Sequence, residues 1–126
     1  SMEAIQILIN RAVELKNEGN LAAALSCYND AFDMLIHEAN SYARQQDGSV
    51  KDIGSVRAIM PKLFDESKKY LKSDMTAAII SNNMGTLMAR LGDFDGAKKM
   101  FEQSVDLTPD NKAYNDPIIG LKELEK

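Results

Sequence analysis

The sequence predicts an all-α fold built from two antiparallel helical hairpins. Alanine, leucine, lysine, glutamate and methionine dominate the chain, and all of them are good helix formers. Proline occurs three times in 126 residues and β-branched runs are few, which argues against a sandwich or barrel. Apolar residues recur at helical spacing in two stretches that can be aligned without gaps. The 44% hydrophobic content is that of a globular domain rather than a disordered chain.

The first hairpin is expected at about residues 3–46. Its two helices are separated by Gly19, and so short a break makes them fold back antiparallel. No proline ends the second helix. We therefore expect this helix to continue through His37 and Tyr42 as far as Gly48.

Between the hairpins, residues 47–61 carry the loop-like glycine, serine and proline composition. The helical pattern resumes at residue 62, and the second hairpin is expected to reach residue 108. Two readings of its start stay open. Asp74 could cap a fresh helix, but we favour one long helix over about 62–91 with a kink near residue 73.

The second hairpin shows the same pattern more clearly. Gly92-Asp93 breaks the first helix, and Thr108-Pro109 stops the second, because proline lacks an N–H and disfavours helix in the residue before it. The apolar stripe of the first helix is Ile80, Met84, Leu87, Met88 and Leu91, and that of the second is Phe94, Ala97, Phe101, Val105 and Leu107.

A last helix is expected at about residues 116–125, with Pro117 in its first turn. Two hairpins alone bury too little apolar surface for stability. This helix, or a second chain in a homodimer, must therefore cover the open face of the second hairpin. The stripe expected to do so is Ile118, Ile119, Leu121 and Leu124.

The stretch 78–111 resembles a tetratricopeptide repeat. The residues that carry the resemblance are Met84-Gly85, Met88, Gly92-Asp93-Phe94, Ala97, Phe101, Ser104 and Pro109. Ser81 departs from the pattern, which has a large residue there. Aligning Gly19 with Gly92 places Ala12, Ala24, Tyr28 and Ala31 on Gly85, Ala97, Phe101 and Ser104, although Arg11 departs from the pattern. The resemblance implies about two repeats, with an extended inter-repeat insertion and a C-terminal capping helix.

The first hairpin also resembles the microtubule-interacting and trafficking domain. The matching residues are Ala12-Val13, Gly19-Asn20, Ala24-Leu25 and Tyr28. That family implies a three-helix bundle that binds the tails of membrane-trafficking proteins. The two families predict different behaviour, because a bundle would let residues 1–73 fold alone whereas a repeat array would not.

The sequence lacks the residues that most enzymes and cofactor sites require. His37 is the only histidine, so one chain cannot build a His-based triad or a multi-His metal site. Cys27 has no basic neighbour one helical turn away to activate it. No phosphate-binding loop motif occurs. We therefore expect neither catalysis nor a cofactor.

Charge and cysteine content bear on partners and location. The net charge of −4 disfavours nucleic acid as a partner. The lone cysteine suits a reducing compartment, no apolar run is long enough to cross a bilayer, and no signal peptide is visible. We therefore expect a cytoplasmic protein that does not insert into membranes.

The tetratricopeptide resemblance implies a scaffold module that binds a peptide of a partner protein in a groove lined by the first helix of each hairpin. The implied groove residues are Gln6, Ile9, Val13, Lys16 and Asn17 in the first copy, and Ile79, Asn82, Asn83, Thr86, Ala89 and Arg90 in the second. The competing reading is that these are ordinary exposed helix residues.

The lengthened helices around the insertion are similar to those of some co-chaperone domains of this family. Asn83 matches one position of the clamp with which such domains hold chaperone tails. The first-helix positions carry Ile9 and Val13, and the last helix offers Ala113 and Pro117 in place of basic residues. We therefore predict that chaperone tails are not bound.

Overall fold

The computed structural model describes residues 1–46, 67–110 and 113–126, and these residues form helices and no strand. The helices are α1 (Met2–Asn17), α2 (Leu21–Gln46), α4 (Thr76–Arg90), α5 (Phe94–Leu107) and α6 (Asp116–Leu124), and residues 67–71 are helical as well. The predicted all-α fold class is confirmed. The expected loop at 47–61 and the start of the expected long helix lie outside the described residues.

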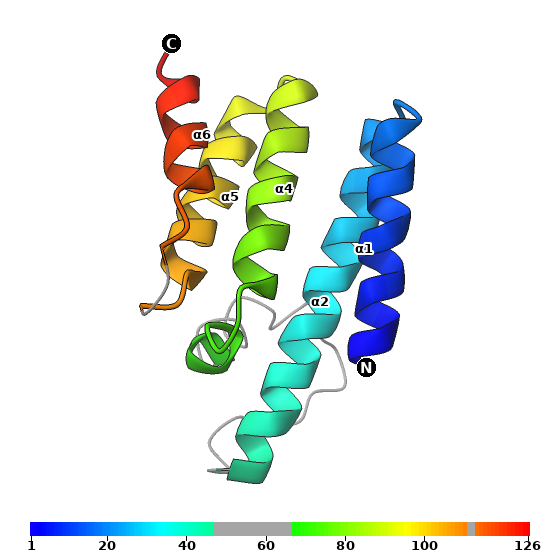
Figure 1. Ribbon diagram of the computed structural model, residues 1–126, viewed down its shortest axis with the longest axis vertical. Coiled ribbons are helices and arrows are strands. Elements are labelled where there is room, and N and C mark those ends of the chain that lie inside the picture. The colour runs from blue at the N-terminus through cyan, green and yellow to red at the C-terminus, as the bar shows by residue number, and fades with distance from the viewer. Residues whose placement is uncertain (47–66, 111–112) are drawn as a thin grey trace.

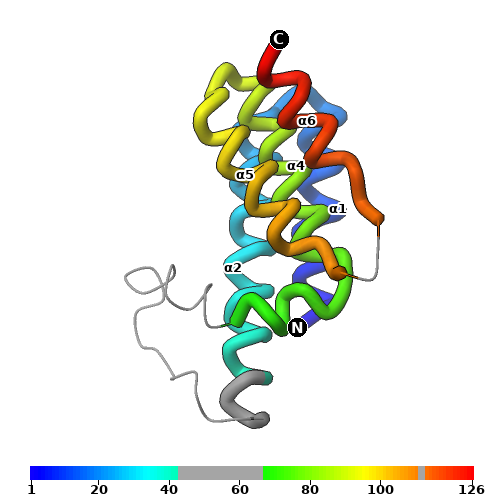
Figure 2. Tube along the Cα trace, turned by 90° about the vertical axis from the view of Figure 1, so that its left-hand side faces the viewer, coloured from blue at the N-terminus to red at the C-terminus, as the bar shows by residue number. Residues whose placement is uncertain are grey.

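The helices are arranged in two layers (Figures 1 and 2). α1, α4 and α6 run parallel in one layer, and α2 and α5 lie in the other. Within each hairpin the two helices pack against each other, α2 packs against α4, and α6 packs against α5 and α4. The first helices of both hairpins therefore share one side of the molecule.

Both hairpins turn in the same way. Gly19 and Gly92 have positive φ angles of 84° and 88°, a conformation that costs glycine little and other residues more. The residue after each glycine caps the next helix with its side chain. Asn20 Oδ1 accepts a hydrogen bond from the Ala23 N–H at 3.3 Å, and Asp93 Oδ1 accepts one from the Gly96 N–H at 2.9 Å.

The aligned positions of the two hairpins are buried alike. Five small residues are completely buried, and one aromatic ring in each hairpin is at most 3% exposed. Small residues let two helices approach closely while the ring fills the space between them. The small residues are Ala12, Ala24, Ala31, Ala97 and Ser104, and the rings are Tyr28 and Phe101.

The Phe101 ring is held between two glycines on different helices. A Cβ on Gly85 of α4 would lie 2.7 Å from Phe101 Cε1, and a Cβ on Gly120 of α6 would lie 2.6 Å from Phe101 Cζ. Real Cβ atoms do not approach this closely, so each glycine leaves the space that the ring occupies. Three helices therefore meet at one side chain of α5.

Ser81, which departs from the tetratricopeptide pattern, is completely buried. Its Oγ accepts a hydrogen bond from Gln103 Nε2 of α5 at 2.9 Å. One turn away, Ser104 Oγ donates to the carbonyl of Ala78 at 2.7 Å. Buried hydroxyl groups need hydrogen-bond partners, and both serines have one. These two hydrogen bonds join α4 to α5 at the place where a larger residue would make apolar contacts.

The favoured long helix over residues 62–91 is wrong, because the chain turns at residues 72–75 before α4 begins. Asp74 Oδ1 accepts the Thr76 N–H at 2.8 Å, and such local bonds compete with a continuous helix. The turn lets Leu71 join the core. Lys68 and Lys72 pair with Asp106 and Asp110 at the end of α5, at 2.6 and 3.4 Å.

The predicted stripe of α6 is also corrected. Ile118 and Ile119 are exposed, whereas Pro117 is buried and Leu121 and Leu124 are half-buried. With Gly120, the last three form the face that meets α5 and α4, since they recur at helical spacing. In the second hairpin Leu91, Phe94 and Val105, which were expected to pack, are exposed as well. Leu91 and Phe94 flank the turn between α4 and α5, and this turn lies at one end of the molecule (Figure 1).

We predict that Gly85→Leu lowers the free energy of unfolding by about 1–3 kcal/mol, because the added carbons overpack the contact with Phe101. Urea denaturation measures this change. The matched control is Thr86→Leu at the neighbouring exposed position, which should unfold like the wild type. Equal stability of the two variants would contradict the close approach of α4 and α5.

We also predict that deleting residues 112–126 causes loss of cooperative unfolding or aggregation, because the Phe101 ring and the adjoining apolar surface become exposed. Ile119→Ser serves as the control, since Ile119 is 56% exposed, and its melting curve should stay unchanged. A truncated chain that remains monomeric with the wild-type melting curve would show that α6 does not cap the array.

Candidate partner-binding surface

The groove residues predicted on α1 form one stripe along the helix. Gln6, Val13 and Asn17 are exposed, and Ile9 and Lys16 are half-buried. Val13 keeps 38% of its surface exposed although it is apolar. Gln6 Nε2 donates to Asn10 Oδ1 at 2.9 Å, one turn further along the helix. The stripe therefore combines an exposed apolar centre with amide groups.

The corresponding stripe on α4 consists of four residues at helical spacing, Ile79, Asn83, Thr86 and Arg90. Ile79 is 40% exposed, much like Val13 on α1. Thr86 and Arg90 are exposed, and Asn83 is half-buried. Ala89, also expected in the groove, is half-buried beside this stripe. The structure thus places a second mixed stripe in the same layer of helices as the first.

Asn82 is the exception among the predicted residues, because it is only 8% exposed. Its side chain lies beside the hydroxyl of Tyr114, a residue that precedes α6, and acts to lower the pKa of that hydroxyl. Burial is the main reason why the pKa of Tyr114 rises to about 12, followed by the negative charge of Asp116. Asn82 joins α4 to the C-terminal segment, so we remove it from the candidate surface.

Asn83 joins the two hairpins. Its Nδ2 donates to the Tyr28 hydroxyl of α2 at 3.3 Å, across 55 residues of sequence. Burial raises the pKa of Tyr28 above its ordinary value, and the hydrogen bond from Asn83 opposes that rise. Part of the hydrogen-bonding capacity of Asn83 is therefore used inside the protein rather than offered to a partner.

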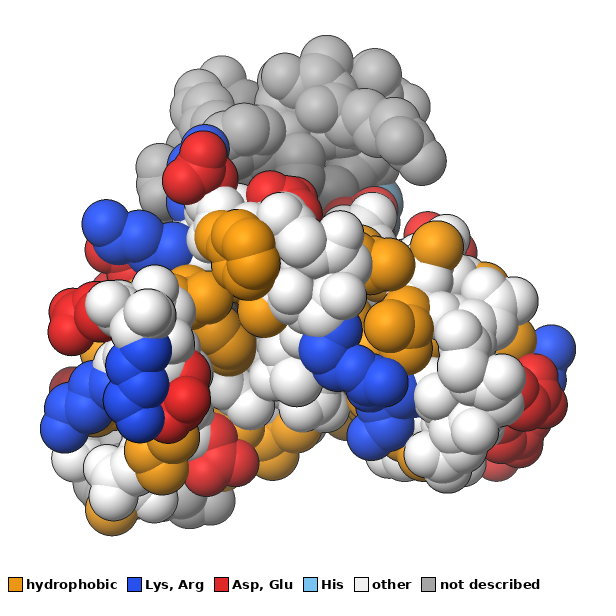
Figure 3. Space-filling model, turned by 90° about the horizontal axis from the view of Figure 1, so that it is seen from above, with side chains coloured by type: hydrophobic (Ala, Val, Ile, Leu, Met, Phe, Trp, Pro, Cys, Tyr) orange, Lys and Arg blue, Asp and Glu red, His pale blue; other side chains and the backbone are white. Residues whose placement is uncertain are grey.

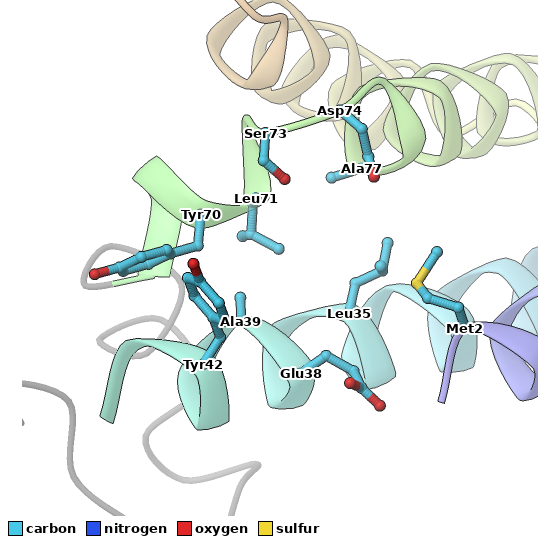
Figure 4. A pocket seen from close by; sticks show the side chains of 10 residues that line it. All are labelled: Met2, Leu35, Glu38, Ala39, Tyr42, Tyr70, Leu71, Ser73, Asp74 and Ala77. Carbon is cyan, nitrogen blue, oxygen red and sulfur yellow. The ribbon is translucent and has the colours of Figure 1, made fainter. Parts of the chain in front are cut away.

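The structure also contains an open pocket of about 340 Å³ that the sequence did not reveal (Figure 4). It lies where the first turns of α1 and α4 approach the middle of α2. Tyr42 and Tyr70 meet edge to face there, with ring centroids 5.2 Å apart, and Glu38 forms an ion pair with the amino group of Ser1 at 2.7 Å. The described lining residues are Met2, Leu35, Glu38, Ala39, Tyr42, Tyr70, Leu71, Ser73, Asp74 and Ala77.

The charges of the groove helices differ from those of the whole chain. α4 contains no acidic residue, and its last turn carries Arg90. Lys16 and Lys122 occupy the last turns of α1 and α6. Figure 3 looks down on this end of the molecule and shows Lys and Arg side chains in the middle, beside hydrophobic ones, with further basic and acidic side chains towards both sides. The carboxyl ends of the three parallel helices thus carry basic groups, which in α1 and α6 stand beside the acidic residues Glu18 and Glu123.

The described part of the chain offers no group of three or more His, Cys, Asp or Glu residues that could hold a metal ion. His37 is exposed and Cys27 is half-buried, and both lie on α2. Within the same residues, no helix has the length and apolar character that a membrane span requires.

Comparison with known proteins identifies one family. Residues 78–111, about a quarter of the chain, match the family model described as tetratricopeptide repeat. This range comprises α4 except for its first two residues, the turn at Gly92-Asp93, all of α5 and Pro109. Neither the curated proteins nor the solved structures contain a match to this chain.

We predict that the protein loses stability between about pH 10 and pH 12, because Tyr28 and Tyr114 have folded-state pKa values above their ordinary 10.0. A raised pKa means that the folded state holds the proton more tightly. The resulting stabilisation is complete below the unfolded-state pKa and is lost as pH rises through the folded-state value. Urea denaturation across this range measures the loss.

The variant Tyr114→Phe should show a shallower decline than the wild type, because it has one raised tyrosine fewer. Tyr42→Phe, at an exposed position, is the matched control. If Tyr114→Phe and the wild type decline in parallel, the buried environment of the Tyr114 hydroxyl is refuted.

Proposed function

We propose that this chain is a protein-interaction module that binds a segment of a partner protein in a groove between α1 and α4. The proposal starts from the match of residues 78–111 to the tetratricopeptide repeat and from the similar packing of the first hairpin. Repeats of this type typically mediate protein–protein contacts and do not catalyse reactions. The observation that carries the proposal is the pair of exposed stripes that α1 and α4 present in one layer.

The composition of the stripes suits a peptide ligand. Val13 in the second half of α1 and Ile79 in the first turn of α4 offer apolar surface, and they are 38% and 40% exposed. Gln6, Asn17 and Thr86 supply side-chain hydrogen-bonding groups for a peptide backbone. Arg90 can hold a carboxylate with two parallel hydrogen bonds. Such a mixture binds a segment of polypeptide rather than a small apolar molecule.

The packing between the hairpins favours a repeat array over an independent N-terminal bundle. α2 packs against α4, and Tyr28 reaches Asn83 with its hydroxyl. In an array, residues 1–73 lose this support and do not fold alone. In a trafficking-type bundle they would fold alone, so circular dichroism of the fragment separates the two functions. We place the module in the cytoplasm, as the cysteine content suggests.

We predict that Ile79→Asp combined with Arg90→Ala weakens partner binding at least tenfold. A lost hydrogen bond to a charged group is worth about 1.5–3 kcal/mol, and each 1.4 kcal/mol is about a tenfold change in affinity. The partner is first captured from cell extract with the intact domain, then purified and titrated by calorimetry. Sedimentation at several concentrations identifies the case in which the captured partner is a second copy.

The chain provides a closely matched control on the opposite layer. Val105→Asp with Lys98→Ala changes the same kinds of residue on α5, and Val105 is 41% exposed against 40% for Ile79. Both double variants should keep the wild-type helical signal. If the α5 variant loses binding and the α4 variant does not, the partner docks on the other layer and the groove assignment is wrong.

A further inference from the structure

The proposed groove has two chemically different ends. α1 and α4 run parallel, so their amino ends meet at one end of the groove and their carboxyl ends at the other. The pocket lies at the amino ends, since Met2 of α1 and Ala77 of α4 both line it over α2. Lys16 and Arg90 lie in the last turns at the opposite end.

At the end with Lys16 and Arg90, the two stripes carry basic residues and no acidic ones, although the chain as a whole has a net charge of −4. No acidic residue occurs in α4 or in the α1 stripe of Gln6, Ile9, Val13, Lys16 and Asn17. Neither basic side chain forms an ion pair with a described residue. The acidic residues of these two helix ends, Glu14, Glu18 and Asp93, lie outside the two stripes, and Glu14 is paired with Arg11. On the face formed by the stripes, Lys16 and Arg90 are therefore the charged groups at this end.

The pocket end has the opposite character. Met2, Leu35, Leu71 and Ala77 give it apolar walls, and the Tyr42–Tyr70 pair closes one side (Figure 4). Its charged lining residues are the carboxylates Glu38 and Asp74, and the described lining contains no lysine or arginine. Glu38 is already paired with the amino group of Ser1, whereas Asp74 forms no ion pair with a described residue. This end therefore accepts an apolar side chain and offers an acidic one no lysine or arginine.

We propose that the groove binds an extended segment with a large apolar residue at one end, seated in the pocket, and acidic residues at the other, paired with Lys16 and Arg90. The inference rests on the proposed function and adds the chemistry of the partner. Met2 and Lys16 are separated by about 21 Å along α1, given a rise of 1.5 Å per residue. An extended chain covers this length in about six residues.

Synthetic peptides test this order directly. The probe is the capped peptide Ac-Phe-Gly-Ser-Gly-Ser-Glu-Glu-NH2, together with its reversed sequence, because charge does not fix the direction of the backbone. The control, Ac-Gly-Ser-Phe-Glu-Glu-Gly-Ser-NH2, has the same composition but places the apolar and acidic residues side by side. Binding is followed by amide chemical shifts of the full chain. We expect either the probe or its reversed sequence to bind at least tenfold more tightly than the control.

Variants test which end of the groove binds the acidic residues of the peptide and which end binds the apolar residue. Lys16→Glu with Arg90→Glu should remove the advantage of the spaced probe, and high salt should reduce it, because exposed charges are screened. Tyr42→Ala should weaken the probe while shifts near Arg90 persist. Lys98→Glu on α5 is the matched control and should leave binding unchanged. Thermal melts show that each variant is folded, since all four positions are exposed or half-buried.

The chemical-shift experiment has four possible outcomes. Shifts at both Ala77 and Leu91 with the spaced probe, lost in the double variant, support it. Equal affinity for the spaced and the compact peptide, with shifts along α1 and α4, overturns the charge order but leaves the proposed groove intact. Shifts confined to α5 overturn the proposed function itself. No shift with any peptide at millimolar concentration overturns the inference alone.

Discussion

The Phe101 ring, held between Gly85 and Gly120, sets the spacing on which the rest of this structure depends. A Cβ at either glycine would lie under 3 Å from the ring. The ring therefore determines how closely α4 and α6 approach α5. Tyr28 takes the equivalent place in the first hairpin, and its hydroxyl reaches Asn83 of α4. Aromatic side chains of the α2–α5 layer thus position the helices of the opposite layer, where the candidate groove lies.

Much of the fold could be predicted because small residues, aromatic residues and turn glycines recur in register. The helix break and the packed face of α6 were missed for physical reasons. Asp74 satisfies a backbone N–H within a single turn, and no glycine or proline signals the break. On α6 the contact with Phe101 is made by Gly120, a residue without a side chain. A prediction based on apolar side chains therefore assigned Ile118 and Ile119 to the packed face instead.

The candidate site was predictable only in part. The tetratricopeptide resemblance implied the two stripes, and all their residues except Asn82 are exposed or half-buried. It could not separate Asn82 from Asn83, which are neighbours in sequence but point to Tyr114 and Tyr28 respectively. The pocket could not be predicted at all, since its lining comes from the start of α1, the middle of α2 and the segment before α4. These segments come together only in the folded chain.

The difference between Gly85 and its counterpart Ala12 also affects which helices pack together while the chain folds. A molecule with two similar hairpins can mispair while it folds, by docking the first helix of one hairpin onto the second helix of the other. A helix that presents Ala12 at this register cannot approach the Phe101 ring as closely as α4 does, because the methyl group needs the space that the ring fills. One additional carbon atom therefore makes this mispaired contact looser than the native one, and the two repeats are alike in architecture without being interchangeable.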